Sequence, residues 1–168
     1  MKMVRVERAK GGGRASPADD VVHQRVTELY DAEYPGMKRL AYTLISNDAE
    51  AEEVVHEAFI EVFRRYDELR RPGAYLRTAV VSRCRSTLRR RRLVGSVPLE
   101  PPTTLTGEPE HLWDLLQTLT EDQRIVVVLR YYGGYRSSEI ADMVGMRAGT
   151  VRQLLRRGLA VLRTELQP

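Results

Sequence analysis

Residues 137–157 read Ser-Ser-Glu-Ile-Ala-Asp-Met-Val-Gly-Met-Arg-Ala-Gly-Thr-Val-Arg-Gln-Leu-Leu-Arg-Arg, and this stretch decides the fold of the C-terminal part of the chain. The pattern is typical of two short helices joined by a tight turn. The small Ala141 allows the helices to approach closely, and Gly145 fits a turn that a Cβ atom would obstruct. Ile140 and Val144 fill the wedge between the helices. The stretch therefore predicts a helix-turn-helix.

The second helix of this pair has an apolar face and a basic face. Its aliphatic side chains share one side of a helical wheel: Val151, Leu154, Leu155, Leu159 and Leu162. The opposite side carries Gly149, Arg152, Gln153, Arg156, Arg157 and Arg163. Arginine and glutamine suit a helix in the major groove of DNA, where they contact base edges and phosphates. The alternative is an ordinary hairpin with a solvated basic face; turn, spacing and charge together favour DNA.

The composition limits what else the chain can be. Its 168 residues carry a net charge of +4, which favours an anionic partner. The single cysteine, Cys84, excludes an internal disulfide and is predicted to be a small buried apolar residue, and the three histidines show no metal-ligand spacing. We therefore predict neither a metal nor a cofactor. No apolar run reaches the roughly 18 residues of a membrane span, so we expect a cytoplasmic protein without membrane insertion.

The N-terminal part divides near residue 20. Residues 1–20 mix basic side chains with Gly11-Gly12-Gly13 and predict a flexible tail. From Val21 to Ile45 apolar residues recur at helical spacing, with an interruption at Pro35-Gly36. This segment predicts two helices or one bent helix.

An acidic amphipathic helix is predicted next. Between residues 48 and 61 there are six carboxylates and no lysine or arginine: Asp48, Glu50, Glu52, Glu53, Glu57 and Glu61. The apolar stripe of the helix is Ala51, Val54, Val55, Ala58, Phe59 and Val62. Asn47 or Asp48 can cap its start. Uncompensated like charges repel one another, so the helix suits binding to a basic protein surface. The alternative is that its acidic face is simply exposed to solvent.

The sign of the charge then reverses. A turn at Pro72-Gly73 precedes a helix predicted from Tyr75, which ends in Arg89-Arg90-Arg91-Arg92. Seven arginines and no acid lie between residues 76 and 92. Such a cluster is typical of phosphate binding. Tyr66 and Tyr75 suit stacking on unpaired bases, although core packing explains Tyr75 equally well.

Residues 93–111 contain four prolines and no periodicity, so we expect an extended linker between two small domains. In the second domain Thr120 caps a helix, with Gln123 completing a capping box, and Gly133-Gly134 ends that helix. The helix-turn-helix follows. With no strand signal in the sequence, we predict an all-α fold.

These motifs, in this order, resemble bacterial sigma factors of the extracytoplasmic function group, the minimal sigma-70 family members with only regions two and four. The resemblance spans about residues 24–164. It rests on these segments: Ala-Glu-Glu-Val-Val-His-Glu-Ala-Phe at 51–59, Tyr75-Leu76-Arg77 through the arginine run, Leu119-Thr120 with Leu129-Arg130-Tyr131-Tyr132, Glu139-Ile140-Ala141, and Gly149-Thr150-Val151-Arg152. Residues 75–81 resemble the sigma-E-like branch that is common in actinobacteria.

The resemblance implies a promoter-recognition subunit of RNA polymerase, with region two at residues 21–92 and region four at residues 112–168. Its partners would be promoter DNA and core polymerase, through the β′ clamp helices and the β subunit, and an anti-sigma protein is expected as an inhibitor. The residues implied to contact polymerase are Glu52, Glu53, His56, Glu57 and Glu61. Those implied to contact the melted −10 element are Tyr66, Arg70, Arg71, Tyr75, Arg77, Ser82, Arg85 and Arg89. Those implied to contact the −35 element are Arg136, Arg147, Thr150, Arg152, Gln153, Arg156 and Arg157.

Three residues depart from the family pattern. Ser82 stands where the family usually has asparagine, Thr120 replaces a common proline, and Arg147 takes a position where serine often caps the recognition helix. The alternative function is a helix-turn-helix regulator that acts without polymerase, with an N-terminal dimerisation or ligand module. An acidic helix followed at once by an arginine-rich one, over residues 48–92, favours the sigma factor. No carboxylate, histidine and nucleophile fall together as an enzyme would need.

Overall fold

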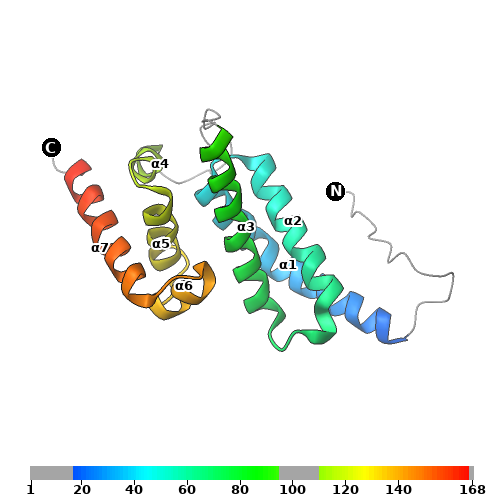
Figure 1. Ribbon diagram of the computed structural model, residues 1–168. Coiled ribbons are helices and arrows are strands. Elements are labelled where there is room, and N and C mark those ends of the chain that lie inside the picture. Colours follow the sequence, from blue (N-terminus) through cyan, green and yellow to red (C-terminus); the bar gives the residue numbers. More distant parts are fainter. Residues whose placement is uncertain (1–16, 95–109, 167–168) are drawn as a thin grey trace.

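The computed structural model describes residues 17–94 and 110–166, and within these two ranges every regular element is a helix (Figure 1). The predicted all-α fold is therefore confirmed for the described residues. The predicted tail and linker lie largely outside those ranges. Their edges differ slightly from the expectation, because the first helix already begins at Pro17 and the third continues to Val94.

Three long helices form an N-terminal bundle: α1 (Pro17–Ile45), α2 (Asp48–Arg65) and α3 (Pro72–Val94), with the short 3-10 helix η1 (Tyr66–Glu68) between α2 and α3. The sequence left open whether the first segment forms two helices or one. The structure shows one helix, α1, which continues through Pro35. A proline inside a helix costs about 3 kcal/mol. The turns directly after it bury Met37, Leu40 and Leu44, and this packing offsets the cost.

Local signals set the ends of α2 and α3. The Asn47 side chain accepts a hydrogen bond from the Glu50 amide at 2.9 Å and so caps α2. Just before it, Ser46 is fully buried and has a left-handed backbone with φ of 64°. The predicted apolar stripe of α2 is buried throughout. Helix α3 begins at Pro72, earlier than predicted, because proline is tolerated in a first turn where its missing N–H has no intrahelical partner.

Four further helices form a C-terminal bundle: α4 (Glu110–Gln117), α5 (Glu121–Tyr131), α6 (Ser137–Val144) and α7 (Ala148–Glu165). The predicted capping box of α5 is present, since the Thr120 hydroxyl accepts from the Gln123 amide and the Gln123 side chain accepts from the Thr120 amide. Gly145 has φ of 64° and makes the predicted turn between α6 and α7. The helix-turn-helix is thus confirmed.

Helix α7 packs closely on α5 at a glycine that the sequence pattern did not single out. Gly158 is buried, and a Cβ atom there would lie 3.1 Å from Cγ2 of Val127. Val151 and Leu155 bury the same side of α7. The close approach fixes how α7 is rotated about its axis and therefore which side chains it turns outward.

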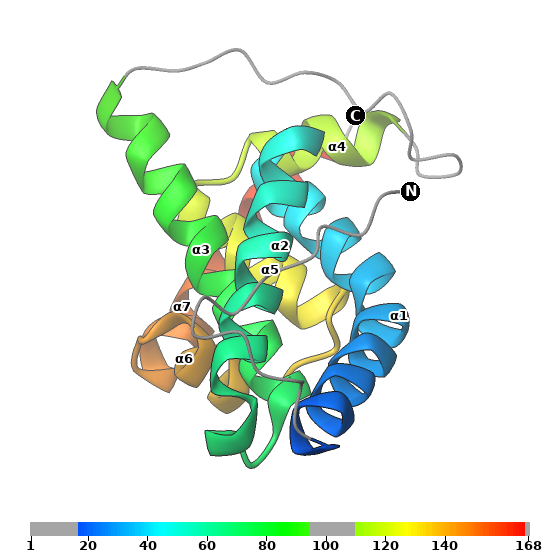
Figure 2. The same cartoon turned by 90° about the vertical axis from the view of Figure 1, so that its right-hand side faces the viewer.

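The two bundles lie against each other. Helix α3 faces α5 and α6, and α1 also contacts α5 (Figures 1 and 2). Buried apolar side chains from both bundles form one continuous cluster. At the edge of this contact, the Gln117 amide donates to the Ser46 hydroxyl at 3.1 Å.

Candidate nucleic-acid interface

The predicted −35 residues lie on the outward face of α7, at the residue before α7 and, for Arg136, at the residue before α6. All seven are exposed: Arg136, Arg147, Thr150, Arg152, Gln153, Arg156 and Arg157. None of these side chains forms an ion pair within residues 17–94 and 110–166. Arg147 occupies the N-cap position of α7 without a side-chain cap, as its departure from the family pattern predicts. The result is a rigid helix with an unpaired basic face, suited to phosphates and base edges.

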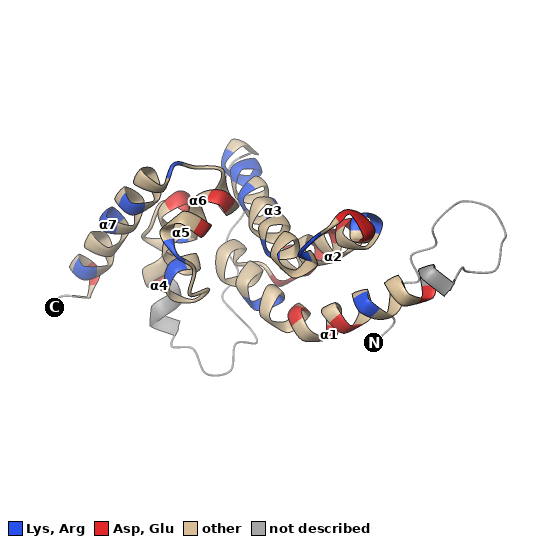
Figure 3. Cartoon of the chain, turned by 90° about the horizontal axis from the view of Figure 1, so that it is seen from below, with Lys and Arg blue, Asp and Glu red and all other residues tan. Residues whose placement is uncertain are grey.

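The arginines of α3 differ, because most are already engaged (Figure 3 shows the basic residues along both helices). Arg77 donates to a Glu33 oxygen at 2.6 Å. Arg83 reaches Glu61 at 2.7 Å and Glu57 at 3.4 Å.

Arg91 is more deeply engaged than the other arginines of α3. Its side chain is only 12% exposed and donates to Glu50 and to the Ile45 carbonyl, each at 2.5 Å. Arg89, Arg90 and Arg92 are exposed, and the described part of the chain offers them no ion pair. The arginine run is therefore partly structural and partly available to a ligand.

Tyr75 is half-buried in a polar network between α2 and α3. Its hydroxyl donates to Glu61 and accepts from Arg65 Nη1, and the Arg65 guanidinium lies over the Tyr75 ring. The hydrogen bonds from Tyr75 and Arg83 lower the pKa of Glu61, and the bond to Glu61 raises the pKa of Tyr75. Tyr66 is half-buried against the core. Base stacking by these two tyrosines stays a prediction; among the other −10 residues, Arg70, Arg71 and Ser82 are exposed.

The expectation that α2 carries uncompensated charge is wrong. Lys38 on α1 lies 3.2 Å from both Asp48 and Glu52, and the arginines of α3 pair with three further carboxylates of α2. The prediction failed because it counted charges on one helix, whereas the compensating cations come from neighbouring helices. Among the residues described, Glu53 alone of the six carboxylates has no ion pair, and it is exposed.

An aromatic group next to these carboxylates was missed. Tyr30 stacks on Tyr34, and the ring of His56 lies 5.7 Å from that of Tyr34. Tyr30 also lies against Phe59, and burial, followed by the charge of Tyr34, raises its pKa to about 12. The spacing of Tyr30 to Tyr34 and of His56 to Phe59, one helical turn each, is the signal that identifies such a group.

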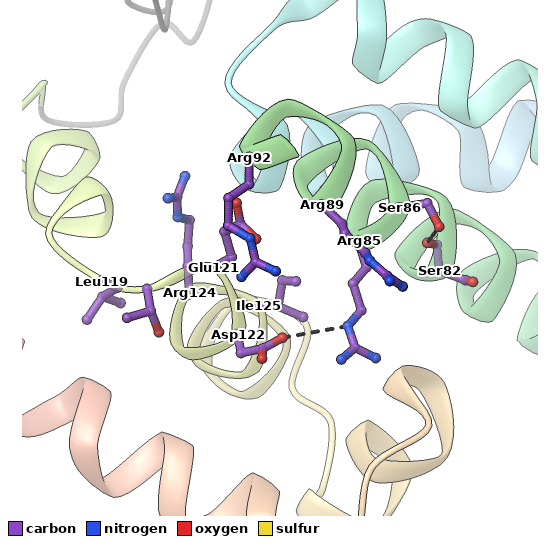
Figure 4. Close-up of a pocket in the computed structure, with 11 residues that line it drawn as sticks. Ser82, Arg85, Ser86, Arg89, Arg92, Leu119, Glu121, Asp122, Arg124 and Ile125 are labelled. Carbon is purple, nitrogen blue, oxygen red and sulfur yellow. Dashed lines mark hydrogen bonds and ion pairs between the residues drawn. The ribbon is translucent and has the colours of Figure 1, made fainter. Parts of the chain in front are cut away.

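A cleft of about 800 Å³ lies between α3 and α5, and Figure 4 shows side chains that line it. Three predicted −10 residues, Ser82, Arg85 and Arg89, lie on its α3 side. Arg85 donates to the Val144 carbonyl at 2.5 Å and lies 3.6 Å from Asp122. On the α5 side Arg124 is 7% exposed. The two bundles therefore meet on the arginine-bearing face of α3.

Comparison with known proteins agrees with this arrangement. Residues 29–94 match the family model of sigma-70 region 2, and residues 110–162 match sigma-70 region 4. The RNA polymerase sigma-E factor of Streptomyces avermitilis is 34% identical over 140 residues, covering 77% of this chain and 78% of that protein. The sigma-E factor of Streptomyces coelicolor is 31% identical over 138 residues, covering 76% and 78%. A crystallised complex of the sigma factor RpoE with the anti-sigma factor NepR from Bartonella quintana shows the same fold, with a TM-score of 0.66 at 20% identity, covering 89% of this chain and 99% of that one.

The chain belongs to the sigma-70 family, in its extracytoplasmic function group. It is a sigma factor, a subunit that gives RNA polymerase its promoter recognition. The region 2 match includes residues 48–92, the segment on which the sigma factor and the independent regulator differ, and so favours the sigma factor. None of the described helices is long and apolar enough to cross a membrane.

Proposed function

We propose that this sigma factor divides promoter recognition among three surfaces. The exposed carboxylates of α2 around Glu53 bind the β′ clamp helices of core polymerase, with a further contact to the β subunit. The α3 face and the η1 turn hold the melted −10 strand. The outward face of α7 binds the −35 element as duplex. The protein acts in the cytoplasm and performs no chemistry itself, because the polymerase supplies the active site.

The observation that carries this proposal is the unpaired basic face of α7. Its arginines are exposed and have no ion pair among the described residues, so binding phosphate costs them no internal contact. Each bidentate arginine contact to a base edge is worth about 1–3 kcal/mol. A helix of this kind binds weakly alone, but it gains a high effective concentration when the N-terminal bundle is already held by polymerase and the −10 strand.

Reconstituted transcription tests the function. Sequencing the transcripts that appear when the protein is overproduced identifies its promoters, and one of these then serves as template for purified core polymerase. We expect a defined transcript only when the protein is added and only while both promoter elements are intact. No stimulation on any promoter identified in this way would contradict the proposal.

The assignment of α2 is tested by reversing charge. Glu53→Lys combined with Glu57→Lys is expected to weaken core binding about tenfold or more, because like charges facing each other across an interface cost a few kcal/mol. Core affinity is measured by fluorescence anisotropy of labelled protein. Asp20→Lys combined with Asp31→Lys, two exposed acids on α1, serves as the charge-matched control. If the control weakens binding equally, the effect is not specific to α2.

An anti-sigma protein is part of the proposal, supported by the fold that this chain shares with a sigma factor crystallised with such an inhibitor. Purification of the tagged protein from its own cells is expected to recover a second partner besides polymerase. Recovery of polymerase alone in both growing and stressed cells would remove this part of the proposal.

A further inference from the structure

Two adjacent tyrosines at the end of α5 are exposed. Tyr131 is 64% exposed and Tyr132 is 42% exposed, whereas the other six of the eight tyrosines are buried or half-buried. Among the residues described, neither hydroxyl makes a hydrogen bond and neither ring packs on another ring. A tyrosine combines a large apolar surface with a polar hydroxyl, so two exposed side by side are typical of a binding surface.

The backbone that presents these tyrosines is rigid. The Gly133 amide donates to the Val128 carbonyl at 3.0 Å, so the chain folds back onto the last turn of α5. The ring of Tyr135 packs so close that a Cβ atom on Gly133 would lie 2.6 Å from it. Arg130 closes the fold by donating to the Tyr135 carbonyl at 3.1 Å. Residues 130–136, the α5–α6 corner, are therefore fixed in place.

The charge of this corner is positive. No aspartate or glutamate lies between residues 123 and 138, and Arg130 and Arg136 flank the tyrosines on either side. The next acid along the chain, Glu139, accepts a hydrogen bond from the Arg136 amide at 2.7 Å and is therefore turned onto the backbone. Exposed aromatic rings between arginines, without an acid among them, favour a nucleic acid as the ligand.

The corner lies next to the surface proposed to bind the −35 element. Arg136, one of the predicted −35 residues, is the N-cap residue of α6. Helix α6 contacts both α5 and α7, and the end of α5, α6 and the start of α7 lie together at one end of the C-terminal bundle (Figures 1 and 2). In a helix-turn-helix on DNA, the second helix enters the major groove and the first crosses the sugar-phosphate backbone. The corner before α6 is therefore held close to that backbone.

We propose that Tyr131 and Tyr132 bind the sugar-phosphate backbone of the promoter duplex at the −35 element, independently of the base sequence. Their hydroxyls donate to phosphate oxygens, a contact that tyrosine makes in protein–DNA complexes, and their rings cover the adjoining sugars. This inference rests on the proposed function, because that function places α7 in the −35 duplex. The corner adds affinity without reading bases, beside a helix that reads them.

A double variant, Tyr131→Ala with Tyr132→Ala, tests the proposal in the full chain assembled with core polymerase. Affinity is measured by fluorescence anisotropy of an identified promoter duplex, with the −35 element either intact or scrambled. We expect at least about a tenfold loss, the size of one hydrogen bond to a charged group, and the same factor on both duplexes. Arg152→Ala should instead weaken binding mainly to the intact duplex, because it removes a base contact.

The control for this variant is Leu166→Ala, which truncates an exposed apolar side chain of the same bundle and should leave affinity unchanged. An unchanged affinity of the double variant, or a loss confined to the intact duplex, overturns the proposal. Binding to core polymerase without DNA should be normal. A weakened core affinity would show that the tyrosines contact polymerase and would equally overturn a DNA contact.

Cleavage of the DNA from the corner gives an independent test. An iron chelate is attached to the thiol of Tyr131→Cys, and peroxide with ascorbate then generates radicals that cut nearby DNA. The natural Cys84 is not labelled, because it is fully buried and burial raises its pKa to about 12. We expect cuts in the promoter duplex at or directly beside the −35 element.

The matched control for cleavage is Leu166→Cys, just beyond the far end of α7. Helix α7 has 18 residues and is therefore about 27 Å long, so a chelate at this end should cut the same region much less. Equal cutting from both positions contradicts the proposal, as does an absence of cuts near the −35 element from Tyr131→Cys.

The proposed function and this inference fail in distinguishable ways. A wild-type protein that does not stimulate core polymerase on any identified promoter contradicts the function itself. A wild-type protein that does so, while the double variant binds both duplexes as tightly, contradicts only the backbone contact of the two tyrosines.

Discussion

Helices α3 and α7 are both rich in arginine, yet their arginines are in different states. On α7 they are exposed and, within the part of the chain that the structure covers, make no ion pair. On α3 several are held by carboxylates or carbonyls of other helices, and Arg85 is held by the opposite bundle. The number of arginines on a helix therefore indicates that it can bind phosphate, whereas tertiary packing decides how many of those arginines are available to do so.

The difference has an energetic consequence. A free arginine that binds a phosphate gains a charge-assisted hydrogen bond and loses mainly water and side-chain entropy. An engaged arginine must also give up its internal partner, so its net gain is smaller. We therefore expect α7 to respond strongly to the loss of an arginine and α3 to respond unevenly.

The largest effect is expected on α7. Arg152→Ala combined with Arg156→Ala should reduce −35-dependent transcription about a hundredfold, because each contact contributes about 1–3 kcal/mol. Run-off transcription with and without an intact −35 element measures this. Core affinity should be unchanged, and Arg163→Ala near the end of the same helix is the control. A comparable loss with Arg163→Ala would mean that α7 acts through net charge alone.

A smaller and uneven effect is expected on α3. Arg89→Ala removes an exposed arginine without an ion pair among the described residues. It should weaken binding of a fluorescent single-stranded oligonucleotide with the −10 sequence of an identified promoter about fivefold or more. Arg85→Ala should change it less than about threefold, because Arg85 is already held by the Val144 carbonyl and by Asp122 and must give these up to bind a phosphate. Fluorescence titration of both variants compares them. Equal losses would show that Arg85 is as available as Arg89.

The smallest effect concerns acid stability. The hydroxyl of Tyr75 and the guanidinium of Arg83 hold the pKa of Glu61 below its ordinary value of 4.5. The unfolded chain therefore binds a proton there first, so the stabilisation is complete above pH 4.5 and is lost as the pH falls through the lower, folded pKa. Glu61→Gln should flatten this decline in urea midpoints measured from pH 6 to pH 3. Glu53→Gln, at a carboxylate without an ion pair in the described ranges, should leave the decline unchanged.

The sequence predicted the features that depend on neighbours along the chain. Asn47, the Thr120 capping box and the left-handed Gly145 each act within about one helical turn, and the structure confirms all three. The buried stripe of α2 and the buried Cys84 followed from periodicity in the same way.

Contacts between helices were beyond that reasoning. The pairing of Arg91 with Glu50 and of Arg85 with Asp122 joins residues far apart in the chain, so nothing local encodes it. The continuation of α1 through Pro35 was also open, since core packing, and not propensity, settles it. The candidate residues could be named from the sequence, whereas their engaged or free state could not.

Ser46 affects both the N-terminal bundle and its contact with the C-terminal bundle. Its left-handed backbone costs a residue with a Cβ atom about 1 kcal/mol relative to glycine, and its hydroxyl receives the Gln117 amide from the other bundle. Glycine here would relax the α1–α2 corner and at the same time delete that acceptor. Relatives with glycine at this position should thus have a more stable N-terminal bundle, and their two bundles should be separated for more of the time.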